Sequence, residues 1–188
     1  MVNVFTLKYI FNTVKLLILI LLLFSKTSFA SDLTQLFSNL KNASDHEIAM
    51  KYEKKIWHYW HNDGSNEKNN AMMKKCLNHL DNGALKISLD CFITLKKIEK
   101  NWAEPINKIA TIKFLLGDYD GSLKDIKLTL LKEPRHFGAI AGSVQINIIL
   151  KKYDRAIKDL DRLKEIHPHI SILSIRPFIL KLLKNSSI

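Results

Sequence analysis

The sequence predicts an all-α solenoid of antiparallel helix pairs, and three observations support this fold class. The stretch GDYDGSLKDIKLTLLKEPRHFG (117–138) has a second copy further along the chain, which contains KKYDRAIKDLDRLKEIHPHI from Lys151. Apolar residues also recur at helical intervals just before the stretch 117–138, as at Ile106, Ile109 and Phe114. No segment shows the alternation of apolar and polar residues, bounded by hairpin turns, that is typical of strands. The chain is therefore expected to stack helical hairpins side by side.

Three copies of this unit align with one another. The second and third copies pair Tyr119 with Tyr153, Asp120 with Asp154, Ser122 with Ala156, Leu123 with Ile157, Ile126 with Leu160 and Pro134 with Pro168. The same shift in the other direction finds a weaker first copy, which places Gly83 under Gly117 and Ser88 under Ser122. In that first copy Lys100 replaces the proline.

Each copy predicts a helix A, a tight turn and a helix B. The expected helices are 70–80 and 85–98, 105–116 and 120–131, and 137–150 and 153–166. A small residue (Ser88, Ser122 or Ala156) occupies the position where the two helices of a pair cross most closely. The proline at the end of the unit cannot continue helix B and so ends it.

The three repeats occupy 70–168, and the other segments flank them. Residues 31–61 carry apolar side chains on two helical faces, which predicts a degenerate N-terminal hairpin, and the polar residues 62–69 predict a loop. Residues 169–188 are expected to cap the last helix pair, because a bare solenoid end would present an apolar patch. Pro177 is expected to bend or divide this capping segment.

Residues 1–30 have the pattern of a secretory signal peptide. Lys8 and Lys15 precede the apolar run LLILILLLF (16–24), and Ser28 and Ala30 supply small residues for a cleavage site after Ala30. The rival interpretation is an uncleaved anchor, but a membrane-spanning helix needs about 20 apolar residues and this run is shorter. We therefore expect an exported, periplasmic protein.

The net charge is positive, and lysine dominates it. The chain has 29 basic and 18 acidic residues, for a net charge of +11. Such an excess attracts anionic lipid, wall polymer or nucleic acid. Phosphate recognition favours clustered Arg forks, whereas 25 of the basic residues are Lys and four are Arg. We expect no nucleic-acid partner and at most a weak contact with anionic membrane surfaces.

Cys76 and Cys91 are the two cysteines of the chain. An exported protein meets conditions in which disulfides persist, and a bridge is conceivable if each residue lies on one arm of a hairpin. Two buried thiols that pack as small hydrophobic side chains are the other state. Of the two we expect the buried thiols.

The repeat itself points to a known family. A 34-residue period with a small residue near position 20 and proline at position 32 resembles the tetratricopeptide repeat. Longer strings are similar to a family of exported bacterial tetratricopeptide-repeat proteins of unassigned biochemical role: IWHYWHNDGS (56–65), AEPINKIAT (103–111), GDYDGSLKDI (117–126) and EPRHFGAIAG (133–142). The chain departs from that family at Ile106, where Trp is usual, and at Lys100, where proline is usual. The resemblance implies an all-helical secreted repeat domain with no established activity.

Signatures of catalysis are missing from the sequence. It has no Gly-x-Ser-x-Gly elbow, no phosphate-cradling glycine loop and no His-Glu-x-x-His pair, so we expect neither an enzyme nor a cofactor. His58 and His61 lie three residues apart with Asp63 just beyond, a spacing that a metal site can use. Because aromatic residues surround these histidines, we expect packed or solvated side chains and no metal.

The string EPRHFG (133–138) is the most distinctive item and lies at a junction between repeats. In a structural interpretation, which we favour, Glu133 pairs with Arg135 or caps the neighbouring helix, Phe137 fills the core between repeats, and Gly138 with Gly142 permits close helix contact. In the functional alternative, Arg135 and His136 reach the groove and contact an acidic ligand.

A stack of such hairpins has a concave wall lined by the A helices. Residues expected on that wall, or at its edge, form the candidate partner-binding site: Asn107, Thr111, Phe114, Gln145, Ile148, Arg135 and His136. Side-chain amides bond a peptide backbone as donors and acceptors, and Phe114 offers an apolar anchor. Two arrangements stay open: an empty groove, and one partly filled by the N-terminal hairpin.

These observations predict a monomeric, non-enzymatic interaction or scaffold module of the bacterial cell envelope, which binds a peptide or helix of a partner protein. The alternative is a peripheral envelope protein that attaches to anionic lipid or wall polymer through its Lys-rich surface. High salt separates the two, because attachment by exposed charges weakens as screening increases.

Overall fold

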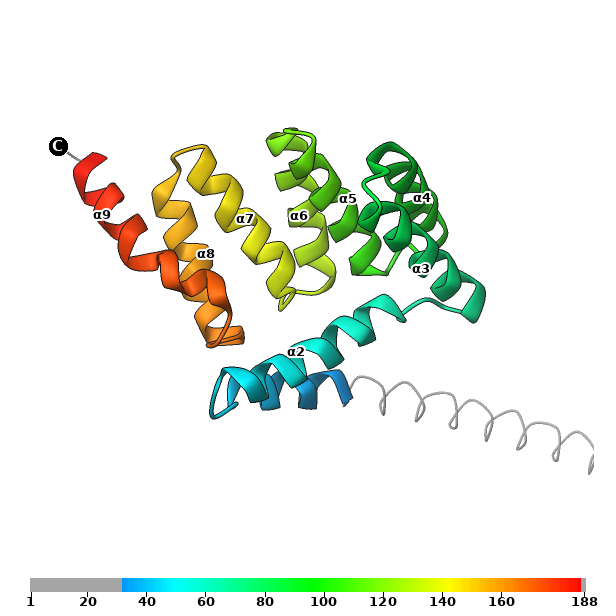
Figure 1. The fold of residues 1–188 in the computed structure, drawn as a ribbon, viewed down its shortest axis with the longest axis horizontal. Helices are drawn as coiled ribbons and strands as arrows, with labels where there is room; N and C mark the ends of the chain where they lie inside the picture. The colour runs from blue at the N-terminus through cyan, green and yellow to red at the C-terminus, as the bar shows by residue number, and fades with distance from the viewer. Residues whose placement is uncertain (1–31, 187–188) are drawn as a thin grey trace, which may run out of the picture.

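The computed structural model describes residues 32–186, and the regular structure of these residues is entirely helical (Figure 1). The expected signal segment at 1–30 lies outside the described residues. The first described helix covers 32–41 and is followed by α2 (His46–His61), α3 (Glu67–Asp81), α4 (Leu85–Ile98), α5 (Ala103–Leu115), α6 (Tyr119–Lys132), α7 (Phe137–Ile149), α8 (Tyr153–Ile166), the 3-10 helix η1 (Ser171–Ile175) and α9 (Arg176–Ser186). Among the described helices, none is long and apolar enough to span a membrane.

Helices α3 to α8 form three antiparallel hairpins that stack along one axis, and α9 packs against α8 at the end of the stack (Figure 1). This arrangement confirms the predicted all-α solenoid. The turn from η1 into α9 comes directly before Pro177, which suits the first turn of a helix because proline lacks only a donor that would be unpaired there.

In two of the repeats, the small residue at the crossing of helix A and helix B also forms a hydrogen bond between the two helices. Ser88 is buried and donates its hydroxyl hydrogen to the carbonyl of Cys76 at 2.9 Å, and Ser122 donates to the carbonyl of Ala110 at 2.7 Å. Both bonds join helix B to helix A of the same hairpin. In the third repeat Ala156 is fully buried at the same position and makes the close contact without a hydroxyl.

The turns between helices A and B also repeat. Gly83 and Gly117 have φ angles of 73° and 79°, in the left-handed region that glycine enters without a steric penalty. Lys151 occupies the place of Gly117 in the next repeat and has a φ of 56°, so the third turn keeps this conformation without glycine. Tyr119 and Tyr153 each begin a B helix and are half-buried, as the repeat requires.

Two helices begin two or three residues earlier than predicted. Helix α3 starts at Glu67 because the side chain of Asn66 accepts a hydrogen bond from the backbone N–H of Asn69 and caps the helix, so the polar loop covers only 62–66. Helix α5 starts at Ala103, and Pro105 lies inside its first turn.

The expectation of two free thiols is wrong. Cys76 on α3 and Cys91 on α4 form a disulfide, with their Cα atoms 5.5 Å apart. The two helices are the arms of one hairpin, so residues equally far from the turn face each other at the distance that a bridge spans. The disulfide therefore ties together the first repeat, which lacks the proline of the other two.

The N-terminal hairpin does not stack as a fourth repeat beside α3. Its buried side chains, among them Phe37 and Trp60, belong to one core cluster with Phe137, Leu160 and Ile179 of the third repeat and the cap. In Figure 1 the hairpin lies across the ends of α5 and α7. The hairpin thus bridges the repeats from the side, and α2 makes few contacts with α3.

A candidate partner-binding groove

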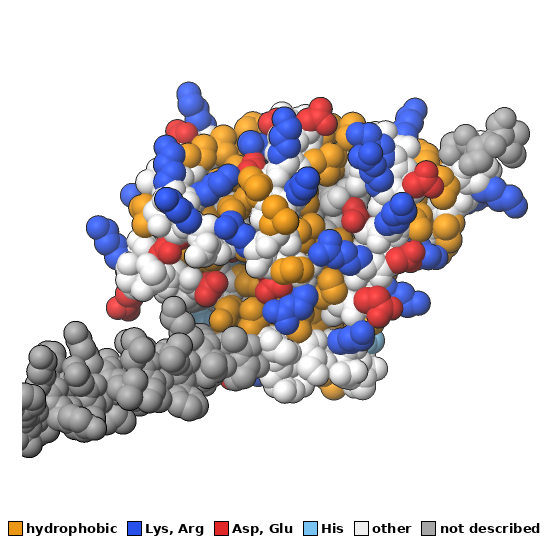
Figure 2. Space-filling view, turned by 180° about the vertical axis from the view of Figure 1, so that it is seen from behind, with side chains coloured by type: hydrophobic (Ala, Val, Ile, Leu, Met, Phe, Trp, Pro, Cys, Tyr) orange, Lys and Arg blue, Asp and Glu red, His pale blue; other side chains and the backbone are white. Residues whose placement is uncertain are grey.

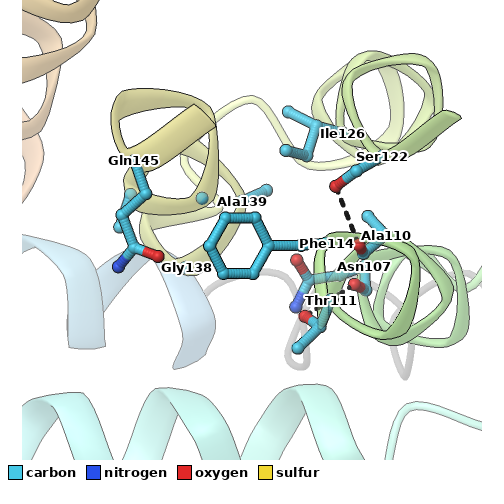
Figure 3. A pocket seen from close by; sticks show the side chains of 11 residues that line it. Asn107, Ala110, Thr111, Phe114, Ser122, Ile126, Gly138, Ala139 and Gln145 are labelled. Carbon is cyan, nitrogen blue, oxygen red and sulfur yellow. Dashed lines mark hydrogen bonds between the residues drawn. The ribbon is translucent and has the colours of Figure 1, made fainter. Parts of the chain in front are cut away.

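A depression of about 200 Å³ lies between α5 and α7, with α6 behind it (Figure 3). Its lining comes from three helices: Asn107, Ala110, Thr111 and Phe114 of α5, Ser122 and Ile126 of α6, and Gly138, Ala139, Ala141, Gly142 and Gln145 of α7. Glycine and alanine make up most of the α7 side, so the backbone of that helix forms part of the wall. We call this depression the α5–α7 groove.

Four of the residues predicted for partner binding meet in the α5–α7 groove: Asn107, Thr111, Phe114 and Gln145. The buried Asn107 donates from Nδ2 to Glu104 Oε2 at 3.1 Å, and Thr111 Oγ1 donates to the carbonyl of Asn107 at 3.0 Å. Gln145 is exposed, and within residues 32–186 its amide has no hydrogen-bond partner. This amide is thus available to a ligand.

Phe114 is half-buried, and its ring lies between α5 and α7 on the side toward Gln145 (Figure 3). The ring centroid is 5.8 Å from that of Tyr119, which supports it from the start of α6. Among the described side chains that line the groove, none carries a charge. The groove therefore combines an apolar anchor with neutral amide and hydroxyl groups, which suits an uncharged stretch of polypeptide.

The structure does not bring Ile148, Arg135 or His136 into this groove. Ile148 packs half-buried against the large core cluster. The guanidinium of Arg135 pairs with Glu133 at 3.0 Å and lies 4.2 Å from the ring centroid of Phe37, on the side of the N-terminal hairpin. His136 is fully buried, so it is closed to a ligand in this structure. These positions agree with the structural interpretation of EPRHFG.

A buried carboxylate at the edge of the groove escaped the sequence analysis. Glu104, in the first turn of α5, is fully buried and bonded on both oxygens. Oε1 is 3.0 Å from Lys108 Nζ and 3.2 Å from His61 Nε2, and Oε2 is 2.8 Å from His136 Nε2. His136 Nδ1 accepts from the N–H of Ala139, so its Nε2 carries the hydrogen that it donates to Glu104.

The pKa of Glu104 reflects this arrangement. Burial alone raises a carboxyl pKa, but the nearby charge of Lys108 and the hydrogen bonds from His136 and His61 outweigh burial and hold this pKa well below its usual value. Glu104 is therefore an ionised group in the core at the meeting point of α2, α5 and α7. A Glu-Pro pair at a helix start gives no hint of this role in the sequence.

His61 is packed beside Glu104, with its Nε2 3.2 Å from Glu104 Oε1, and does not form a ligand set with His58 and Asp63. Within residues 32–186, no group of three or more His, Cys, Asp or Glu side chains is arranged to hold a metal ion.

The N-terminal hairpin covers one end of the groove and leaves the groove itself uncovered. The Trp57 ring packs on Gly138 so closely that a Cβ there would lie 2.5 Å from Trp57 Cη2. Trp60 stacks on His136 with ring centroids 3.9 Å apart, and its carbonyl accepts the indole N–H of Trp102 at 2.6 Å. In Figure 3 this hairpin passes along the lower edge, below Thr111 and Asn107.

Comparisons with known proteins agree with this fold. No family model matches the chain. A TPR repeat-containing protein of Rhizobium etli is 35% identical over 138 residues, which cover 72% of this chain and 66% of that relative. The solved structure of the first TPR of Spaghetti bound to an HSP90 peptide superimposes with a TM-score of 0.59, over 63% of this chain and 94% of that one, at 18% identity.

Proposed function

We propose that this chain, a tetratricopeptide-repeat protein, is a non-enzymatic interaction module that binds a short segment of a partner protein in the α5–α7 groove. The observation that carries the proposal is an uncovered depression between the A helices of neighbouring repeats, with the Phe114 ring beside the free amide of Gln145. The Spaghetti TPR, a protein of the same fold, is bound to a peptide of HSP90. This supports binding of a polypeptide.

The chemistry of the groove selects the kind of segment. Peptide N–H and C=O groups match the donor and acceptor of the Gln145 amide, and an apolar side chain of the partner fits beside Phe114. Lys108 does not serve as an anion receptor here, because its Nζ is held by Glu104 at 3.0 Å and lies 5.0 Å from the ring centroid of Trp57. We therefore propose an internal, uncharged stretch of the partner as the ligand, in preference to a terminal carboxylate.

A periplasmic location is also part of the proposal, and it rests on the signal-peptide pattern of residues 1–30. If the signal peptide is cleaved after Ala30, the partner is another protein of the bacterial envelope. Mass spectrometry of the protein recovered from the periplasm tests this, since a chain that begins at Ser31 is expected. A chain that keeps residues 1–30 and stays in the membrane fraction contradicts it.

Site-directed photo-crosslinking tests the groove. A photoreactive phenylalanine analogue replaces Gln145 in one version of the protein and Leu131 in a matched version, because Leu131 is 71% exposed on α6 and outside the groove. We expect a discrete crosslinked partner from position 145 that is absent from position 131. Equal recovery of the same proteins from both positions would refute groove binding.

Two substitutions in the position-145 version show whether the crosslink reports binding. Phe114→Ala removes the proposed anchor and is expected to abolish the adduct, whereas Leu115→Ala trims a neighbouring side chain that is 55% exposed and is expected to preserve it. The circular-dichroism melting curve of each variant verifies that the protein is folded. An adduct that survives Phe114→Ala at full yield would also count against the proposal.

A further inference from the structure

A second hollow, outside the α5–α7 groove, lies where α4, α5 and α6 meet. Its volume is about 470 Å³, and its apolar floor consists of Leu89 and Ile93 of α4 and Ile109 of α5. Its charged lining is Lys96, Lys97, Lys100, Lys113 and Asp125. We call this hollow the basic groove. Four lysines and one aspartate around an apolar floor give it a strongly positive rim.

The lysines of the basic groove fall into two kinds. The buried carboxylate of Asp125 holds Lys113 Nζ at 2.6 Å and Lys96 Nζ at 3.2 Å. Lys97 and Lys100 are exposed, and within residues 32–186 neither has an ion-pair or hydrogen-bond partner. Lys97 lies in the last turn of α4, and Lys100 lies two residues beyond the end of that helix. The uncommitted positive charge is thus concentrated at one end of the apolar floor.

The repeat provides an internal comparison, because the same positions recur in the next repeat at the junction of α6, α7 and α8. There the four lysines are replaced by residues without charge: Leu130, Leu131, Pro134 and Asn147. Only the acid remains, as Asp159, and it is bonded by Ser143 at 2.6 Å and Asn147 at 3.3 Å instead of by lysines. The solenoid therefore does not require lysines at this junction.

Figure 2 shows one face of the molecule, on which positive charge is widespread. Lys and Arg side chains are spread over that face with acidic side chains among them and apolar ones between. A general attraction to anionic surfaces does not depend on any one of these charges. The basic groove differs because its free charges border an apolar hollow.

We propose that the basic groove binds a single-chain anionic amphiphile of the fatty-acid type. The hydrocarbon chain lies on Leu89, Ile93 and Ile109, and the carboxylate lies between Lys97 and Lys100. The volume of the basic groove, about 470 Å³, falls within the range of about 300–1,000 Å³ that is usual for small-molecule sites. One apolar floor with free cations at one end matches a ligand with one tail and one charged head. This site is independent of partner binding in the α5–α7 groove.

Calorimetric titration with dodecanoate, kept below its micelle concentration, tests the site. We expect saturable binding of one molecule per protein chain. Decanoate, with two fewer methylene groups, is expected to bind up to about 15-fold more weakly if the chain is fully buried, because each buried methylene contributes about 0.8 kcal/mol. Dodecyltrimethylammonium and dodecyl maltoside have the same chain with a cationic or an uncharged head, and neither is expected to bind measurably.

Two double variants assign the binding to this groove. Lys97→Glu with Lys100→Glu is expected to weaken dodecanoate binding at least about tenfold, since it replaces two charge-assisted contacts with repulsion. Lys124→Glu with Lys127→Glu makes the same change of net charge, at the same spacing, on exposed positions of α6 outside the groove. This control is expected to bind dodecanoate like the unmodified protein.

Three results would overturn the proposal. The first is equal affinity in both double variants, and the second is binding of the cationic amphiphile as tightly as dodecanoate. The third is adsorption to phosphatidylglycerol vesicles without any binding of dodecanoate, which would assign the lysines to a membrane surface instead. None of these outcomes bears on the photo-crosslink at position 145, so the two proposals can fail separately.

Discussion

Replacing Glu104 by glutamine tests whether a buried charge holds the N-terminal hairpin and two repeats together. Glutamine has nearly the same shape but keeps one acceptor oxygen and turns the other into an amide that donates. Two of the hydrogen-bond donors around Glu104 then face the NH2 group of the glutamine, which cannot accept a hydrogen bond. Lys108, whose side chain is only 16% exposed, loses its counter-charge. Removing one partner of a buried ion pair costs about 3–5 kcal/mol. Because Lys108 is not fully buried, we expect the lower value, about 3 kcal/mol.

Urea unfolding, followed by circular dichroism at pH 7, measures this change. At a slope of about 2 kcal/mol per molar urea, a loss of about 3 kcal/mol lowers the midpoint by about 1.5 M. Glu165→Gln is the matched control, because Glu165 pairs with Lys41 at 3.2 Å while both side chains are more than half exposed. Exposed pairs contribute at most about 1 kcal/mol, so the control midpoint should barely move.

The pH dependence provides an independent check with a fixed sign. The pKa of Glu104 is lowered on folding from its ordinary value of 4.5. Its contribution to stability is therefore complete above about pH 4.5 and is lost as the pH falls through the lower folded pKa. The difference in unfolding free energy between the unmodified protein and Glu104→Gln should therefore shrink as the pH falls below about 4.5. A difference under about 1 kcal/mol at pH 7 would refute the reasoning, because a buried pair predicts several times more.

Three further variants test contacts in the core. Gly138→Ala places a methyl group 2.5 Å from Trp57 and should lower the unfolding free energy by about 1–3 kcal/mol in thermal melts. Cys76→Ser with Cys91→Ser removes the disulfide that closes a loop of 15 residues, and it should lower the unfolding free energy by about 3 kcal/mol. A reductant acting on the unmodified protein should have the same effect. Ser122→Ala removes one buried hydrogen bond, and urea titration should show a loss of about 1 kcal/mol.

Much of the solenoid was predictable because each repeat is a local unit. Its two helices, turn and closing proline lie within a single repeat, so their signals recur at a fixed spacing in the sequence. Helices α4 and α8 begin and end where the period predicts. The serine hydrogen bonds at Ser88 and Ser122 were not predicted, because a small residue and a donor give the same pattern at that position.

The contacts that fix the groove were less predictable, since they join distant parts of the chain. The spacing of residues along the A helices was enough to predict that Asn107, Phe114 and Gln145 share one wall, and all three line the groove. The position of the N-terminal hairpin has no periodic signal, because it depends on how Trp57 fits over Gly138. The disulfide was misjudged for a related reason: spacing allows a bridge, but only the packed hairpin shows that the two Cα atoms lie within reach.

The residues of EPRHFG (133–138) make mainly structural contacts, and one of them, Gly138, also lines the α5–α7 groove. His136 links Glu104 to α7, Phe137 fills the core under the N-terminal hairpin, and Gly138 admits Trp57. Because these contacts join α7 to α5 and to the N-terminal hairpin, we expect them to influence the separation of α5 and α7 and so the width of the α5–α7 groove. Substitutions in the motif should therefore weaken partner binding through the position of α7. The same substitutions should lower the free energy of unfolding by an amount similar to the loss of binding free energy. If the proposed ligand binds in the groove, substitutions of the exposed Gln145 should weaken its binding and leave the free energy of unfolding unchanged, which distinguishes the two effects.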